Sequence, residues 1–272
     1  MNAKLLCRLF AGIVVALLLT IAAQAQNKAL DPVDRKDDWW TKRHAENVER
    51  MNQGDIELLL IGDSITHGWD NQKELYEKYF GAYKTINLGF SGDQTAHVLW
   101  RLDHLPLDKI SPKVAMIMIG TNNIGHRDGS TPQETVAGIV AIVQKLHKQY
   151  PKLQILLLDV FPRDEKPDGD YRKKVNEINE ALPSMLQRAS LVSPLTRMSL
   201  KGDFLDKDGT LPKSIMGDSL HPGKEGYEIW GDAVSPTIKR LFQQYDRQNR
   251  RTVLRERISP PPLLPRLRSL LR

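Results

Sequence analysis

The sequence predicts an α/β protein, a doubly wound three-layer α/β/α sandwich built around a five-stranded parallel sheet. Five short apolar runs rich in branched residues recur along the chain, and runs that are apolar on both faces are typical of buried strands in a parallel sheet. Polar or glycine-containing turns and then helical patterns follow these runs, so strands alternate with crossover helices. The 272 residues, 40% of them apolar, are enough for one substantial core and exclude a disordered, collagen-like or disulfide-stapled chain.

The predicted strands and helices follow one another in a regular order. The strands are expected at residues 56–61, 84–88, 114–119, 153–160 and 190–193. Two short helices are expected at 71–80 and 94–102, a longer one at 133–149 and the last at 224–244. A proline at position 132 indicates the start of the third helix, because proline is favoured at the first helical position. We expect one domain over residues 26–245.

The first 25 residues have the pattern of a secretory signal peptide. Two basic residues precede an apolar run at 9–22, and residues 23–25, Ala-Gln-Ala, supply the small side chains of a cleavage site. The run is shorter than the roughly 20 residues that cross a bilayer, so cleavage after Ala25 and a secreted or periplasmic protein without a transmembrane segment are expected. An uncleaved N-terminal anchor is the alternative. Cys7 is the one cysteine, so the cleaved protein would depend on its core for stability, without disulfides.

The positive charge of the chain is concentrated in residues 246–272. This segment holds eight arginines against Asp246 and Glu256, whereas the whole chain carries a formal net charge of +6. The globular part is therefore close to neutral, which excludes a basic body that could follow the phosphates of a nucleic acid. Three consecutive prolines at 260–262 forbid a continuing helix. We expect a basic, Pro- and Arg-rich disordered tail, or one that contacts anionic lipid, cell-wall polymer or acidic polysaccharide.

Polar residues cluster immediately after the first three predicted strands and again before the last helix. The clusters are residues 62–64 (Gly-Asp-Ser), 89–93 (Gly-Phe-Ser-Gly-Asp), 120–123 (Gly-Thr-Asn-Asn) and 218–221 (Asp-Ser-Leu-His). In open α/β sheets, ligands bind in the crevice beyond the carboxyl ends of the strands. The clusters are therefore expected to meet at one site.

These clusters contain the groups needed for nucleophilic catalysis by a serine. A serine hydroxyl is a weak nucleophile, so it needs a base within hydrogen-bond reach and a third group that orients this base. Ser64 is the candidate nucleophile, His221 the candidate base and Asp218 the group that orients the imidazole. A tetrahedral intermediate also needs donors for its oxyanion. The candidates are the backbone N–H groups of Ser64 and Gly92 and the side-chain amide of Asn122.

Two aspartates beside these groups are expected to have structural roles. Asp63 is expected to accept hydrogen bonds at the turn or helix start, and Asp93 to cap the helix that follows it. The Gly-x-Ser-x-Gly motif of another hydrolase class is absent around Ser64. A calcium loop with Gly209 at its glycine position would place Phe204 at the first ligand. No phosphate-binding loop is found, so neither a metal nor a cofactor is expected.

The four clusters, in this order, resemble the four sequence blocks of the SGNH hydrolase (GDSL esterase/lipase) superfamily. Residues 87–93 (Asn-Leu-Gly-Phe-Ser-Gly-Asp), followed by 97–102 (His-Val-Leu-Trp-Arg-Leu), are closer still to the catalytic subunits of intracellular platelet-activating-factor acetylhydrolase. The resemblance extends over about residues 56–241. Ile65 stands where many relatives have leucine. A secretory signal does not fit an intracellular enzyme, so the substrate of that group is not carried over.

The resemblance implies a flavodoxin-like SGNH hydrolase fold and a Ser/His/Asp acyl hydrolase. It implies Ser64 as the nucleophile, His221 as the base and Asp218 as its orienting partner, with Gly92 and Asn122 as oxyanion donors. It permits a homodimer.

The expected function is that of a serine esterase that hydrolyses short-chain acyl esters, acetyl esters of carbohydrates among them, through an acyl-serine intermediate. One alternative is an acylhydrolase of the lipase or lysophospholipase type, which needs an extended apolar acyl site. No long lid segment is visible in the sequence, which favours the esterase. The other alternative is a non-catalytic protein that binds carbohydrate or the cell envelope on the same fold, since fold alone does not fix function.

Overall fold

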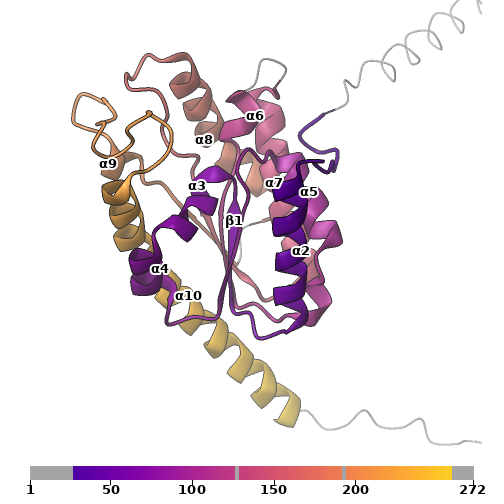
Figure 1. The fold of residues 1–272 in the computed structure, drawn as a ribbon. Helices are drawn as coiled ribbons and strands as arrows, with labels where there is room; N and C mark the ends of the chain where they lie inside the picture. The colour runs from indigo at the N-terminus through magenta and orange to yellow at the C-terminus, as the bar shows by residue number, and fades with distance from the viewer. Residues whose placement is uncertain (1–26, 126–128, 192–193, 259–272) are drawn as a thin grey trace, which may run out of the picture.

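The sheet at the centre of the molecule has five parallel strands and carries helices on both faces (Figure 1). The computed structural model describes residues 27–125, 129–191 and 194–258. The strands lie in the order β2-β1-β3-β4-β5, which is the flavodoxin-like order of a doubly wound sheet and confirms the predicted fold class. They are β1 (Leu58–Gly62), β2 (Thr85–Gly89), β3 (Val114–Met118), β4 (Gln154–Leu158) and β5 (Leu195–Met198).

The first strand lies at the point where the strand order reverses, between β2 and β3. Gly62, the last residue of β1, is in register with Gly89 of β2 and Met118 of β3. The three strands therefore end side by side, and the loops that follow them meet at one edge of the sheet. This is the crevice in which doubly wound folds bind their ligands.

The helices form two layers, one on each face of the sheet (Figure 1). On one face lie α2 (Asp38–Asn52), α5 (Thr95–His104), α7 (Pro132–Gln149) and α8 (Asp170–Arg188). On the other face lie α3 (Ser64–His67), α4 (Lys73–Phe80), α9 (Lys201–Phe204) and α10 (Lys224–Ile258). Short helical segments follow or connect these elements: η1 (Gly68–Asn71), η2 (Leu107–Lys109) and α6 (Thr121–Gly125).

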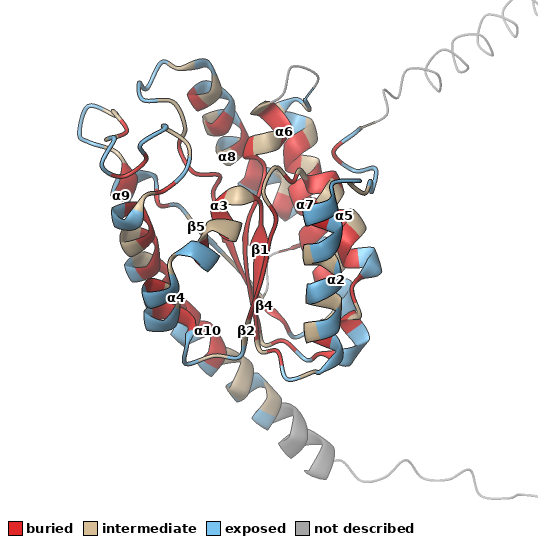
Figure 2. Cartoon of the chain, viewed as in Figure 1, coloured by how far each residue is buried: buried red, intermediate tan, exposed pale blue. Residues whose placement is uncertain are grey.

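Each strand contributes side chains to two separate hydrophobic cores. Leu59 and Ile61 of β1 pack in the core beneath α5, α7 and α8, whereas Leu58 and Leu60 pack in the core beneath α4 and α10. Successive side chains of a strand point to opposite faces, and burial on both faces explains why β1, β3 and β4 have no exposed residue. Figure 2 shows these strands as buried and the outer sides of the helices as exposed.

The first four strands and the first three predicted helices are confirmed to within a few residues, but the fifth strand was predicted too early. β5 lies at Leu195–Met198, and residues 192–193 lie outside the described residues. Ser190 has a positive φ of 56° and its N–H donates to Gln187 O, while Leu191 N–H donates to Leu186 O. These contacts end helix α8, so Ser190 and Leu191 belong to a helix terminus and not to a strand.

The last helix continues beyond its predicted end at residue 244. Figure 1 shows α10 running past the edge of the sheet as far as Ile258. Gln154 Nε2 donates to Gln248 Oε1 over 3.0 Å, and Lys113 Nζ lies 3.7 Å from Asp246 Oδ1, so the start of the sheet supports this extension. The predicted domain boundary at 245 therefore lies inside a helix, and the first part of the basic tail is helical.

The predicted signal peptide and the proline-containing end of the tail lie outside the described residues. Within the described part of the chain, no helix combines the length and the apolar character that crossing a bilayer requires.

Candidate active site

Ser64 lies at the junction between strand β1 and helix α3. Asp63 precedes it and its Oδ1 accepts a hydrogen bond of 3.0 Å from Ile65 N–H, which caps the start of α3 as the sequence predicts. Gly62 closes the strand: a Cβ there would lie 2.4 Å from Met118 O, so only glycine fits between β1 and β3. The strand-to-helix turn thus places the Ser64 hydroxyl at the end of the sheet, half-buried.

His221 and Asp218 reach Ser64 from the loop that precedes α10. Ser64 Oγ lies 2.9 Å from His221 Nε2, and His221 Nδ1 lies 2.7 Å from Asp218 Oδ2. An ionised carboxylate can only accept hydrogen bonds, so Nδ1 carries the proton and Nε2 accepts from the Ser64 hydroxyl. The structure therefore brings together the three residues that the sequence proposes for nucleophile, base and orienting group.

The loop around Asp218 holds the carboxylate in the orientation that this chain of hydrogen bonds needs. Its Oδ1 accepts from the backbone N–H groups of Leu220, at 3.0 Å, and His221, at 2.7 Å. Burial raises the pKa of Asp218, but the hydrogen bonds from the His221 side chain and backbone outweigh it, and the pKa lies below its usual value. Asp218 therefore stays ionised at neutral pH and keeps the imidazole in the tautomer that accepts from Ser64.

Gly92 and Asn122 follow the two strands that flank β1. Gly92, after β2, has a φ of +79°, a left-handed conformation that glycine adopts without strain. Asn122 lies in α6, directly after β3, and its Nδ2 donates to Asp93 O over 3.0 Å. Among the described residues no acceptor binds the second N–H of this amide, which leaves it for a substrate oxygen. Because β1, β2 and β3 end side by side, the segments that carry Ser64, Gly92 and Asn122 follow neighbouring strands at the same edge of the sheet.

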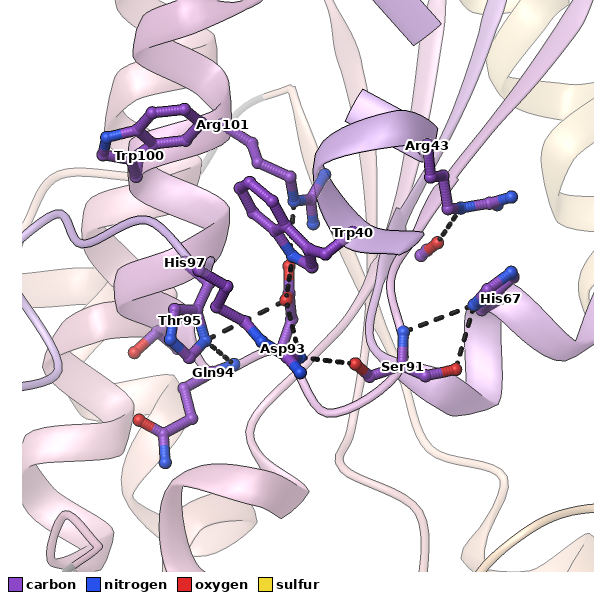
Figure 3. A network of polar contacts seen from close by, with 12 residues as sticks. Trp40, Arg43, His67, Ser91, Asp93, Gln94, Thr95, His97, Trp100 and Arg101 are labelled. Atoms are coloured by element: carbon purple, nitrogen blue, oxygen red, sulfur yellow. Dashed lines mark hydrogen bonds and ion pairs between the residues drawn. The ribbon is translucent and has the colours of Figure 1, made fainter. Parts of the chain in front are cut away.

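The structure corrects the expected role of Asp93. Helix α5 begins after Gln94, whose side chain forms a reciprocal capping box with His97, so Asp93 does not cap it. Asp93 is fully buried instead, and its carboxylate accepts from Trp40 Nε1 and Arg101 Nε, each at 2.8 Å (Figure 3). A buried charge of this kind is stable only where donors satisfy it, and Trp40 lies too far away in the sequence for a local pattern to reveal the pairing.

A cleft of about 390 Å³ opens beside Ser64. His67 and Ser91 are two of its polar wall residues that the sequence analysis did not assign, and His67 Nδ1 lies 2.9 Å from Ser91 Oγ (Figure 3). Burial and the nearby Arg43 guanidinium lower the pKa of His67, so the imidazole is neutral at pH 7. The signal for these residues was their position, one helical turn after Ser64 and next to Gly92. The lining residues are Ser64, His67, Gly68, Asn71, Gln72, Ser91, His221, Pro222 and Tyr227.

Cation ligands do not gather anywhere in residues 27–125, 129–191 and 194–258: no group of three or more His, Cys, Asp or Glu side chains is placed to hold a metal ion. The Ser64 hydroxyl, the His221 imidazole and the Asp218 carboxylate instead form a chain able to transfer a proton from the serine to the imidazole.

Comparison with known proteins identifies a matching family and related proteins. Residues 60–229 match the model of the GDSL-like lipase/acylhydrolase family. The chain is 33% identical over 207 residues to platelet-activating factor acetylhydrolase IB subunit alpha1 of Homo sapiens, covering 75% of this chain and 85% of that protein.

Two solved structures share the fold at lower identity. A GDSL-like lipase from Bacteroides thetaiotaomicron superposes with a TM-score of 0.59 at 21% identity, covering 73% of this chain and 97% of that one. Axe2, an acetylxylan esterase from Geobacillus stearothermophilus, superposes with a TM-score of 0.54 at 17% identity, covering 70% and 94%. The matched family, the identity to its members and the shared fold show that this chain is an ester hydrolase belonging to the GDSL-like lipase/acylhydrolase family.

Proposed function

We propose that this ester hydrolase is a serine esterase specific for short acyl groups, acetyl above all, carried on polar alcohols such as carbohydrates. The observation that supports it most is the hydrogen-bonded chain from Ser64 through His221 to Asp218. The name of the human relative supports the acetyl group, since that protein is an acetylhydrolase. Axe2, named as an acetylxylan esterase, supplies the carbohydrate precedent on this fold.

In the first half of the proposed reaction, Ser64 Oγ attacks the ester carbonyl carbon while its proton passes to His221 Nε2. The carbonyl oxygen becomes an oxyanion, which accepts from the N–H groups of Ser64 and Gly92 and from the amide of Asn122. The bond between carbon and the alcohol oxygen then breaks, and His221 returns its proton to the leaving alcohol. The acyl group remains on Ser64 as an ester.

In the second half, water attacks the acyl-serine. His221 accepts a proton from the water as the new carbon–oxygen bond forms, and the oxyanion again meets the same three donors. Collapse of this intermediate breaks the bond to Ser64 Oγ, and the proton returns to the serine. Asp218 stays ionised throughout and stabilises the imidazolium that forms twice in each cycle.

The cleft beside Ser64 favours a polar alcohol over a long acyl chain. Its wall contains the side-chain amides of Asn71 and Gln72, the His67 imidazole and the Ser91 hydroxyl. Such groups offer donors and acceptors that match sugar hydroxyls, whereas burying them against an acyl chain would leave them without partners. The alternative of a lipase or lysophospholipase needs an extended apolar acyl site, whereas in this cleft the polar groups stand beside Pro222 and Tyr227.

The proposal is tested by hydrolysis of p-nitrophenyl acetate, butyrate and octanoate with the chain that begins at residue 26. We expect acetate to be preferred, and Ser64→Ala and His221→Ala each to lower kcat by at least about 10³-fold, as losses of nucleophile and base do elsewhere. Ser184→Ala, an exposed serine of α8, is the matched control and should leave kcat unchanged. Acetylated xylo-oligosaccharides then test the alcohol.

Each other result has a definite meaning. Preference for octanoate would overturn the short-chain esterase in favour of a lipase. Activity in Ser64→Ala equal to that of the unsubstituted chain would remove Ser64 as the nucleophile. If no ester were hydrolysed, the non-catalytic carbohydrate or envelope binding protein would become the better proposal.

We also propose that the protein is exported, with cleavage after Ala25, and acts in the periplasm or outside the cell. The basic, apolar and small-residue regions of residues 1–25 support this proposal. The mass of the chain recovered from the periplasmic or culture fraction tests it, because cleavage leaves Gln26 as the first residue. Recovery of the full-length chain from the membrane fraction would favour the uncleaved anchor.

A further inference from the structure

We propose that Asp93 is a positioning residue for the oxyanion donors, and that the segment before the family match, residues 27–52, holds it in place through Trp40. The proposal rests on the serine esterase function proposed above. Trp40 and Arg35 lie upstream of residue 60, where the match to the family model begins. The match to the family model therefore does not cover these two residues.

The carboxylate of Asp93 is clamped between two elements. Trp40 Nε1 of α2 donates to Oδ1 and Arg101 Nε of α5 donates to Oδ2, both over 2.8 Å (Figure 3). Asp93 has no exposed surface, and Trp40 and Arg101 are each 1% exposed. Loss of one donor would leave part of a buried charge unpaired, which costs far more than loss of a surface pair. The carboxylate therefore has one strongly preferred position.

The backbone of the same residue determines where two of the three oxyanion donors, Gly92 N–H and the Asn122 amide, lie. Asp93 O accepts from Asn122 Nδ2 over 3.0 Å, which fixes the rotation of that amide and the direction of its other N–H. Gly92 precedes Asp93 directly, and Asp93 N–H donates to Phe90 O over 3.1 Å, closing the turn that contains Gly92. A shift of Asp93 would thus move the Gly92 N–H and the Asn122 amide together.

Arg35 holds the outer side of this turn. Its Nη1 donates to Ser91 O over 2.7 Å and lies 3.6 Å from Asp93 Oδ1. A Cβ on Gly92 would lie 2.9 Å from the same Nη1, so the guanidinium packs directly against the glycine. The turn is held from the N-terminal segment by Arg35 and Trp40 and from α5 by Arg101.

This arrangement matters for the reaction because oxyanion stabilisation depends on donors that are in place before charge develops. A misplacement of about 1 Å by a distant substitution can lower the rate by about 10²-fold. Since the donors act on the transition state more than on the bound ester, loosening the clamp should lower kcat and leave KM nearly unchanged.

The sharpest test removes the Trp40 donor and retains an aromatic ring. Trp40→Phe is expected to lower kcat for p-nitrophenyl acetate by about 10-fold, with KM within about twofold. Phenylboronic acid, which forms a tetrahedral adduct on the Ser64 hydroxyl, should lose affinity by a similar factor. Trp100→Phe is the matched control, because Trp100 packs 5.4 Å from the Trp40 ring in the same aromatic cluster. It should leave kcat and boronate affinity unchanged.

A second pair of variants tests the same proposal without a substitution of the buried Trp40. Arg35→Gln deletes the hydrogen bond to Ser91 O at a side chain that is 21% exposed, whereas Trp40 is 1% exposed. Arg50→Gln is its control, since Arg50 makes a similar bond to Gly54 O at the far end of α2. We expect a fall in kcat and boronate affinity for Arg35→Gln alone, at unchanged KM.

Two results would overturn the inference. The first is that each test variant has the same kcat as its control, that is, Trp40→Phe the same as Trp100→Phe and Arg35→Gln the same as Arg50→Gln. The other is a fall in kcat without loss of boronate affinity, which would indicate a general structural effect. A failure of the proposed esterase function is recognised separately, because the unsubstituted chain would then show no activity that depends on Ser64. In that case the affinities of the variants for phenylboronic acid would still test whether Trp40 and Arg35 position the oxyanion donors.

Discussion

At the scale of single residues, the most unusual group beside the nucleophile is Asp63. Its side chain is fully buried, and within the described residues its Oδ2 has no hydrogen-bond partner. Burial raises the pKa of Asp63 to about 7, although the hydrogen bond from Ile65 N–H acts to lower it. The folded protein therefore binds a proton that the unfolded chain releases above about pH 4. Stability contributed by this proton is present at low pH and is lost as pH rises towards 7.

We predict that Asp63→Asn flattens this pH dependence. The amide keeps an acceptor for Ile65 N–H and has no charge to bury, so the melting temperature relative to the unsubstituted protein should be higher at pH 8 than at pH 5. Asp208→Asn is the control, because hydrogen bonds from Thr210 lower the pKa of that exposed carboxyl group. The Asp208 carboxyl group therefore does not titrate between pH 5 and pH 8. A difference in melting temperature between Asp63→Asn and the unsubstituted protein that stays constant from pH 5 to pH 8 would contradict the prediction.

At the scale of elements, the position of helix α3 depends on the absence of a side chain at the end of β2. A Cβ on Gly89 would lie 2.2 Å from His67 N and 2.6 Å from Thr66 C, both backbone atoms of α3. Backbone atoms cannot rotate out of the way as a flexible side chain can. The close approach of α3, which begins at Ser64, to the end of β2 therefore depends on Gly89.

We predict that Gly89→Ala displaces α3 and lowers both stability and activity. Overpacking of this kind costs about 1–3 kcal/mol, measured as the free energy of unfolding in urea, and kcat should fall because Ser64 moves with the helix. Gly202→Ala in α9 is the control, since no atom lies within 4 Å of the added Cβ. Equal urea midpoints for the two alanine variants would show that α3 adapts to the extra methyl group.

At the scale of the whole molecule, the basic C-terminal segment lies away from the catalytic residues. The basic residues gather at the C-terminal end, and α10 runs away from the body of the fold, whereas the catalytic groups lie at the opposite edge of the sheet (Figure 1). A chain shortened after Arg250 should therefore keep its kcat/KM for p-nitrophenyl acetate. It should lose salt-sensitive binding to phosphatidylglycerol vesicles, because attraction to anionic lipid is screened by salt.

Neutral phosphatidylcholine vesicles serve as the control for that truncation, since neither chain should bind them. Equal binding of the full and shortened chains to anionic vesicles would remove the tail as an attachment segment. A loss of kcat/KM on truncation would show instead that the extension of α10 supports the catalytic edge of the sheet.

The parallel sheet and the location of the site could be predicted from sequence patterns. Buried parallel strands must be apolar on both faces, so β1, β3 and β4 could be recognised as apolar runs. Parallel strands also have their carboxyl ends at one edge of the sheet, so Ser64, Gly92 and Asn122, which follow such strands, were predicted to lie at that edge. The fifth strand was misplaced because β5 is only partly buried and contains Arg197, so it lacks that pattern.

The contacts that hold these groups in place could be found only in the folded structure. Asp93 was expected to be a helix cap because local patterns describe neighbours in the chain, whereas its partner Trp40 is 53 residues away. The pairing of His67 with Ser91 and the grip of Arg35 on the turn before Asp93 likewise join separate segments. Such contacts depend on how helices and loops pack in three dimensions, and no periodicity in the sequence records them.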